Sequence, residues 1–321
     1  GRVASVLPFL LFVVERAYLQ AKHATRPIVW AVIIANVANV LFNFLFIYGD
    51  ECLSWIGLPG IGLPALGVLG AGLATTLVSI LQAGILARAI AKLPVAPDPQ
   101  RRRLSWPDLA RVFRLGIPTG SYILLEIAFF VSGGVVAGTL GRAAVDGHQV
   151  VLSVASFTFT VSLGIAAAGG TRVCSHVGRR DHLGARRAGV LALVLGATFM
   201  STAAVVFLTL AGPLARLFST NASVVAVAVT LFPVAAAFQL SDGVQVVAAG
   251  ILRGAGDTKS PVYVNLIGHW LIGAPVIYWL VFHAHLGPVG IYWGFFAGLT
   301  AVGVPLVLLF WRLCSRPVVR V

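Results

Sequence analysis

Charged residues are scarce in this sequence. They make up 10% of its 321 residues, whereas a soluble domain carries about 25%. Hydrophobic residues reach 59%. This balance leaves too few polar side chains to cover a globular surface, so we exclude a soluble domain and expect a protein embedded in a membrane.

Cysteine is also rare. The three cysteines, Cys52, Cys174 and Cys314, are far apart and lack the spacing of a metal site. The sequence offers no nucleophile–base or metal constellation, so we expect no enzyme.

The net charge of +13 could indicate a protein that binds nucleic acid. However, the basic residues lie in short loops between apolar runs, so we expect no nucleic-acid partner.

Long apolar runs dominate what is present. Runs of roughly 18 or more residues predict membrane-spanning helices, and continuous runs without alternation exclude a β-barrel. We therefore expect an all-α, polytopic membrane protein with about nine transmembrane helices. The segments are 3–21, 28–48, 64–90, 113–140, 145–171, 187–211, 222–249, 262–284 and 287–311.

The loops between these segments alternate in basic charge. Most Lys and Arg residues fall in every second connection, for example around Arg101, Arg179 and Arg312, while the other connections hold few. Because cytoplasmic loops carry the excess of Lys and Arg, this pattern places the start of the chain outside and its end in the cytoplasm. We expect a multi-pass protein of the plasma membrane, or of the inner membrane in a bacterium.

One cytoplasmic connection divides the chain. Residues 94–103 read PVAPDPQRRR, a Pro-rich linker, and Ser105 to Asp108 read as a capping box that begins a helix. We expect a partial N-terminal lobe at 1–93, a cytoplasmic linker with the start of a short surface helix at 94–108, and a C-terminal lobe at 109–321.

The two lobes share a short repeat. YLQAKHATRP at 18–27 aligns with ILRGAGDTKSP at 251–261, with Thr25 opposite Thr258 and Pro27 opposite Pro261. Each motif lies at a cytoplasmic turn followed by two more spans. The repeat predicts two parallel copies of six helices, a common plan of secondary transporters. The first copy would retain only its last three helices, so we expect three helices to be missing.

Two acidic residues interrupt apolar segments. Glu126 lies in SYILLEIAFFV and Asp242 in AAAFQLSDGVQVVAAG. Glu126 comes after Arg114, and Asp242 comes before Arg253, at a similar separation along the chain. Because these arginines mark the cytoplasmic ends of their segments, both carboxylates should lie roughly 16–18 Å from that side. Acidic side chains at this depth usually face a cavity and serve function. They predict a site for a proton or a hard cation; a structural hydrogen bond, for instance to Gln239 or Gln245, is the alternative.

A second polar site is possible in the first lobe. Asn39 and Asn43 are four residues apart and share a helix face, and Thr75 lies in the next segment. Asn and Thr also stabilise membrane helix packing through hydrogen bonds. Both interpretations stay open.

Several motifs together resemble the MATE family of multidrug and toxic-compound extrusion transporters, in its NorM-like branch. LRGAGDTKSP at 252–261 and LGPVGIYWG at 286–294 look like the second-lobe signature, and RAYLQAKHATRP at 16–27 looks like its first-lobe counterpart. GIPTGSYILLE at 116–126 looks like the seventh helix of that branch. The resemblance covers essentially the whole chain.

The resemblance implies a twelve-helix antiporter in which inflow of H+ or Na+ drives export of organic cations, drugs or other amphiphiles. Carried over by position, Glu126 and Asp242 match the second-lobe cation site, and Asn39, Asn43 and Thr75 match polar positions of the first lobe. Arg253 and Asp257 belong to the cytoplasmic loop motif. Phe238 replaces an aromatic hydroxyl that the family carries one turn before the Asp.

We therefore expect a monomeric antiporter that binds small molecules and membrane lipid and needs no cofactor beyond its coupling ion. One alternative is a flippase for lipid-linked precursors from the same superfamily. Such a flippase would line its cavity with cationic residues, whereas here Lys and Arg avoid the middle of the membrane. The other alternative is a truncated remnant that does not transport.

Overall fold

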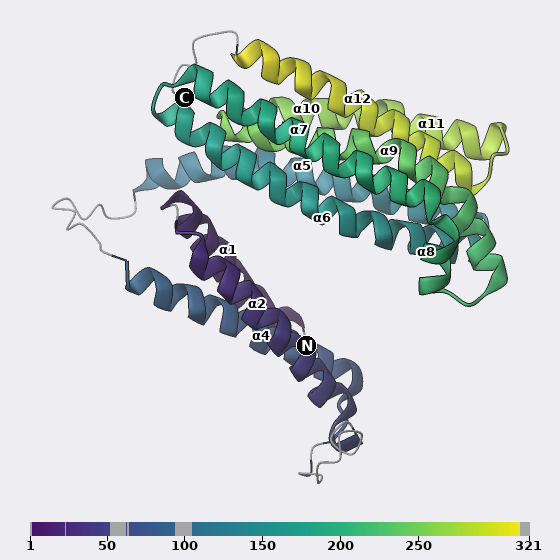
Figure 1. The fold of residues 1–321 in the computed structure, drawn as a ribbon, viewed down its shortest axis with the longest axis horizontal. Coiled ribbons are helices and arrows are strands. Elements are labelled where there is room, and N and C mark those ends of the chain that lie inside the picture. The colour runs from purple at the N-terminus through teal and green to yellow at the C-terminus, as the bar shows by residue number, and fades with distance from the viewer. Residues whose placement is uncertain (1, 23, 52–61, 63, 94–104, 315–321) are drawn as a thin grey trace. The chain divides into compact units, whose positions relative to one another are not determined.

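The computed structural model describes residues 2–22, 24–51, 62, 64–93 and 105–314. The chain forms two compact units, residues 1–101 and 102–321, which are coloured from purple to yellow along the chain in Figure 1. Most of the expected linker, 94–104, and Cys52 lie outside the described residues. Every regular element within the described part is helical, as the continuous apolar runs predicted.

The first unit is a small group of helices. A 3-10 turn, Arg2–Ser5, leads into α1 (Val6–Ala21), followed by α2 (Arg26–Tyr48) and α4 (Gly67–Ala91). Helix α4 packs against both α1 and α2. Gly70 allows the close approach, because a Cβ at this position would collide with the backbone of Phe46 in α2.

The second unit is a bundle built around one helix, α9. Helices α6, α7, α8 and α12 all pack on it. The elements in order are α5 (Trp106–Thr139), α6 (Arg142–Gly178), α7 (His182–Thr209), α8 (Ala211–Phe218), α9 (Ala222–Gly254), α10 (Ser260–Asn265), η2 (Leu266–Gly273), α11 (Ala274–Tyr278), η3 (Trp279–His283) and α12 (Pro288–Cys314). Segments η2 and η3 are π-helical, so α10 to η3 form one continuous span.

Eight helices in the described part are long and apolar enough to cross a membrane. They correspond to eight of the nine expected segments. The remaining segment, 3–21, contains α1, whose 16 residues are shorter than a typical span.

Helix α5 begins as expected but continues further. Ser105 caps it, and its hydroxyl oxygen accepts a hydrogen bond from the Asp108 backbone N–H. The sequence predicted a short, separate surface helix here. Instead, Trp106–Thr139 is one helix of 34 residues. The helix continues without a break past Arg114 and through Pro118.

The repeated motifs share one backbone hydrogen bond. The Ala24 N–H donates to the Leu19 carbonyl at 2.9 Å after α1, and the Asp257 N–H donates to the Leu252 carbonyl at 3.0 Å after α9. After α9 this bond belongs to a Schellman motif, in which Gly256, with φ +96°, is the left-handed residue before the donor. The same bond joins the Asp181 N–H to the His176 carbonyl after α6, so it is common to these helix ends, and the internal repeat stays a prediction.

Two apolar clusters fill the second unit. One includes Phe129, Phe238 and Phe295, and the other includes Tyr122 and Val246. Helices α5 and α9 contribute to both clusters. The stretch of each helix between the clusters therefore lies in the middle of the bundle, and this is where the two unusual carboxylates are found.

Candidate functional site

Both predicted carboxylates are buried in the second unit. Glu126 on α5 is 6% exposed, and Asp242 on α9 is 3% exposed. Each lies where its helix passes from one apolar cluster to the other. Placing an acidic residue at the centre of a membrane helix costs about 3 kcal/mol on insertion scales, so the fold has to compensate for both.

Gln245 connects the two helices at this point. Its Nε2 donates a short hydrogen bond to Oε1 of Glu126. Gln245 is also buried, and it follows Asp242 by three residues, so both point from the same face of α9. The fold thus brings Glu126 toward the face of α9 that carries Asp242.

The two carboxylates differ in their hydrogen bonding. Glu126 has the amide donor that the structural alternative named. Asp242 Oδ1 is buried and has no hydrogen-bond partner among the described residues. A buried acceptor without a donor is costly. The structural alternative therefore accounts for part of Glu126 but leaves this oxygen of Asp242 unexplained.

Further polar groups lie close by that the sequence did not single out. Tyr122 is one turn before Glu126 and is 2% exposed, and its hydroxyl interacts with the side chain of Asn265. Asn265 and His269, one turn apart on α10 and η2, are fully buried, and neither ring nitrogen of His269 has a hydrogen-bond partner among the described residues. The His269 ring stacks on Phe129, with centroids 4.4 Å apart.

A signal for these residues was present in the sequence. Tyr122 and Glu126 are four residues apart, as are Asn265 and His269, so each pair shares a helix face. Tyr, Asn and His in apolar spans are less unusual than carboxylates, however. Only the packing of α10 and η2 on α5 shows that they belong to one region.

Arg253 and Asp257 lie in different surroundings. Arg253 lies in the last turn of α9, and its guanidinium carbon is 5.3 Å from the centroid of the Tyr122 ring. It therefore extends the polar region toward the C-terminal end of α9. Asp257 Oδ1 accepts a hydrogen bond from the Ser260 N–H at 3.0 Å, which satisfies a free donor at the start of α10.

The side chains of the candidate first-lobe site form hydrogen bonds within their own helices. The Asn43 amide donates to Asn39 Oδ1 at 2.9 Å, and the Thr75 hydroxyl donates to the Ala71 carbonyl at 2.9 Å. Helices α2 and α4 pack together, but these bonds do not link them. A polar site at Asn39, Asn43 and Thr75 stays a prediction.

Phe238 lies one turn before Asp242 and is fully packed. It is 1% exposed and stacks on Tyr292, with ring centroids 5.9 Å apart. The nearest turn of α9 therefore presents no hydroxyl to Asp242. Tyr122 on α5 holds the equivalent place one turn before Glu126.

The sequence was compared with known families and proteins. The sequence model of the MatE family matches residues 118–279. The probable multidrug resistance protein NorM of Bradyrhizobium diazoefficiens is 34% identical over 99% of this chain and 68% of its own length. This chain belongs to the MATE family. The multidrug resistance protein NorM of Burkholderia vietnamiensis is 36% identical over 92% of the chain and 63% of its own length.

Solved MATE structures share the fold. The crystal structure of a mutant of the Vibrio cholerae MATE transporter VcmN matches 99% of this chain and 69% of its own length, with a TM-score of 0.85 and 16% identity. That of the eukaryotic MATE transporter AtDTX14 matches 94% of this chain and 66% of its own length, with a TM-score of 0.80 and 22% identity. The present chain thus spans about two thirds of the length of its relatives.

Proposed function

We propose that this MATE protein belongs to an ion-driven exporter of organic cations, drugs or other small amphiphiles. Family membership and the NorM relatives named for multidrug resistance support this function. The protein would act in the plasma membrane, or in the inner membrane of a bacterium, as a monomer. Its coupling ion would be H+ or Na+, with no other cofactor.

The observation that carries the proposal is the buried pair Glu126 and Asp242. A buried carboxylate is stable when it is protonated or has bound a cation. When it is charged and unpaired, conformations that expose it to water are favoured. A site of this kind binds the ion with different affinity in the two conformations of a transporter. Differential affinity is what allows an ion gradient to shift a conformational equilibrium.

Each residue then has a defined role. Glu126 and Asp242 bind the ion, and Gln245 holds Glu126 in place through its amide. Oxygen ligands of this kind suit a hard cation, and carboxylates suit a proton equally well. The Tyr122 hydroxyl, which lies beside the side chain of Asn265, would complete the ligands on the α5 side.

Neutralising either carboxylate tests the proposal. Glu126→Gln and Asp242→Asn keep the side-chain shape and remove the charge, so both should abolish ion-driven dye transport by the full-length protein in proteoliposomes. Stability should be unchanged or slightly increased, because the membrane cost of a buried charge disappears. Asp146→Asn is the matched control, because Asp146 is exposed and, among the residues that the structure describes, forms an ion pair with Arg142 alone, at 3.8 Å.

The outcomes separate clearly. Ion-dependent transport near the wild-type rate in both variants would contradict the ion site, since Glu126→Gln can still hydrogen-bond in a purely structural role. Loss of transport with a normal melting temperature supports it. Applying a proton gradient and then a sodium gradient identifies the coupling ion.

A further inference from the structure

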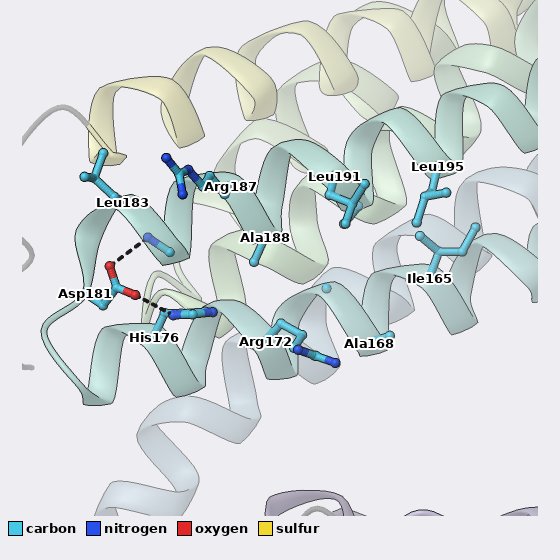
Figure 2. A pocket seen from close by; sticks show the side chains of 13 residues that line it. Ile165, Ala168, Arg172, His176, Asp181, Leu183, Arg187, Ala188, Leu191 and Leu195 are labelled. Atoms are coloured by element: carbon cyan, nitrogen blue, oxygen red, sulfur yellow. Dashed lines mark hydrogen bonds and ion pairs between the residues drawn. The ribbon is translucent and has the colours of Figure 1, made fainter.

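A groove runs between α6 and α7 at one end of the second unit. It has a volume of about 750 Å³. The positively charged ends of both helices place this end at the cytoplasmic side. Figure 2 shows Arg172 on α6 and Arg187 on α7 on opposite walls of the groove, with their side chains pointing away from each other, and Ile165, Leu191 and Leu195 farther along it.

Small residues make the groove. Ala168, Gly169, Ala188 and Ala192 line it between the larger side chains. The helices approach closely here, because a Cβ on Gly169 would lie only 2.6 Å from that of Ala192. From Arg187 to Leu195 the groove follows α7 for about 12 Å, which is most of one leaflet of a roughly 30 Å hydrocarbon core.

The apolar part of the groove is open to its surroundings. Leu191 is 60% exposed and Leu195 is 52% exposed. In a membrane such side chains face acyl chains rather than water.

The polar end of the groove carries unbalanced positive charge. Its acidic side chain, Asp181, is already engaged: Oδ1 accepts from the Gly184 N–H at 2.8 Å, and Oδ2 lies 2.9 Å from Nδ1 of His176. These two bonds, the Gly184 bond first, lower the pKa of the Asp181 carboxyl. The charge of Arg187 also lowers this pKa, but neither Arg187 nor Arg172 forms an ion pair within the described part of the chain.

We propose that this groove binds an anionic glycerophospholipid of the cytoplasmic leaflet. Its headgroup lies at the end lined by Arg172 and Arg187, whose side chains turn toward the phosphate from the two walls, and an acyl chain lies along Ala168, Leu191 and Leu195. Basic pockets between transmembrane helices on the cytoplasmic side suit anionic headgroups, and the apolar length below the arginines suits a chain rather than a free anion. The site is separate from the buried carboxylates and does not depend on the transport proposal.

The charge requirement is tested by titrating the full-length protein in non-ionic detergent with phosphatidylglycerol and counting bound lipids by native mass spectrometry. Each basic residue contributes about 1 kcal/mol, so Arg172→Gln with Arg187→Gln should weaken binding about 30-fold. Arg179→Gln with Arg180→Gln removes the same charge from the same loop, outside the groove, and should leave binding nearly unchanged. Equal loss in the control pair would show diffuse surface attraction and overturn the site.

The chain requirement has its own control. Ala168→Phe should fill the groove and reduce phosphatidylglycerol binding, whereas Ala167→Phe, exposed on the same helix but outside the groove, should not. Binding that survives Ala168→Phe would overturn the proposal. So would equal binding of phosphatidylcholine, which lacks net charge, or displacement of the lipid by inorganic phosphate, which would indicate a small-anion site. Melting temperatures confirm that each variant is folded.

Discussion

At the scale of single residues, Gln245 and Gln239 form an informative pair on α9. Both amides are fully buried. Gln245 donates to the Glu126 carboxylate, and Gln239 donates to the neutral Thr158 hydroxyl at 2.8 Å. The same side chain on the same helix thus meets an acidic group in one case and a hydroxyl group in the other.

This contrast leads to a prediction for Gln245→Leu and Gln239→Leu. Hydrogen bonds between membrane helices contribute about 1 kcal/mol or less, so both variants should lose a similar, small stability in thermal unfolding. Only Gln245→Leu should alter the ion concentration that gives half-maximal transport, because only Gln245 holds a proposed ion ligand. An equal change of ion dependence in both variants would remove Gln245 from the site.

At the scale of helices, the contact between α6 and α9 relies on small residues. A Cβ on Gly250 would lie 2.8 Å from the backbone oxygen of Ala166, and one on Gly170 would lie 2.7 Å from the backbone oxygen of Gly250. Ala166 and Gly170 are four residues apart, as are Gly250 and Gly254. This is the small-xxx-small pattern that lets membrane helices approach closely.

We therefore expect Gly250→Ala to destabilise the protein by about 1–3 kcal/mol, since backbone cannot move aside as a flexible side chain can. Gly164→Ala on α6 is the matched control: its Cβ would meet nothing within 4 Å. This control should be neutral or slightly stabilising, because alanine restricts the unfolded chain. The measurement is thermal unfolding in detergent, and equal melting temperatures for both variants would contradict the close contact.

At the scale of the whole molecule, the alternating basic charge predicts the orientation of the protein in the membrane. Arg172, Arg179 and Arg187 lie at the α6–α7 turn, and Cys174 is an exposed free cysteine beside them. The same pattern places Cys52 on the outer side. Because charged loops do not cross the bilayer readily, the two cysteines should differ in access.

The prediction uses single-cysteine versions of the full-length protein. In intact cells a membrane-impermeant maleimide should label the version that retains Cys52, and should label the version that retains Cys174 only after permeabilisation. Cys314 should behave like Cys174 and serves as a second internal control. Labelling of Cys174 in intact cells would reverse the orientation and would also place the proposed lipid groove in the outer leaflet.

The sequence alone determined the membrane class and the helical spans, and it singled out the two buried carboxylates, Glu126 and Asp242; the orientation that it predicts stays a prediction. Each of these features depends on a local property of the sequence: the length of an apolar segment, the charge of a loop, or the cost of burying a charge in the bilayer. The family motifs also pointed correctly to MATE.

Only the tertiary structure decided which side chains meet. It showed that Gln245 rather than Gln239 reaches Glu126, that α5 continues without a break where a separate helix was expected, and that Arg172 and Arg187 flank one groove. Such contacts depend on how each helix is rotated and how closely it approaches its neighbour. Those quantities are set by packing between helices, which hydropathy along a single segment does not specify.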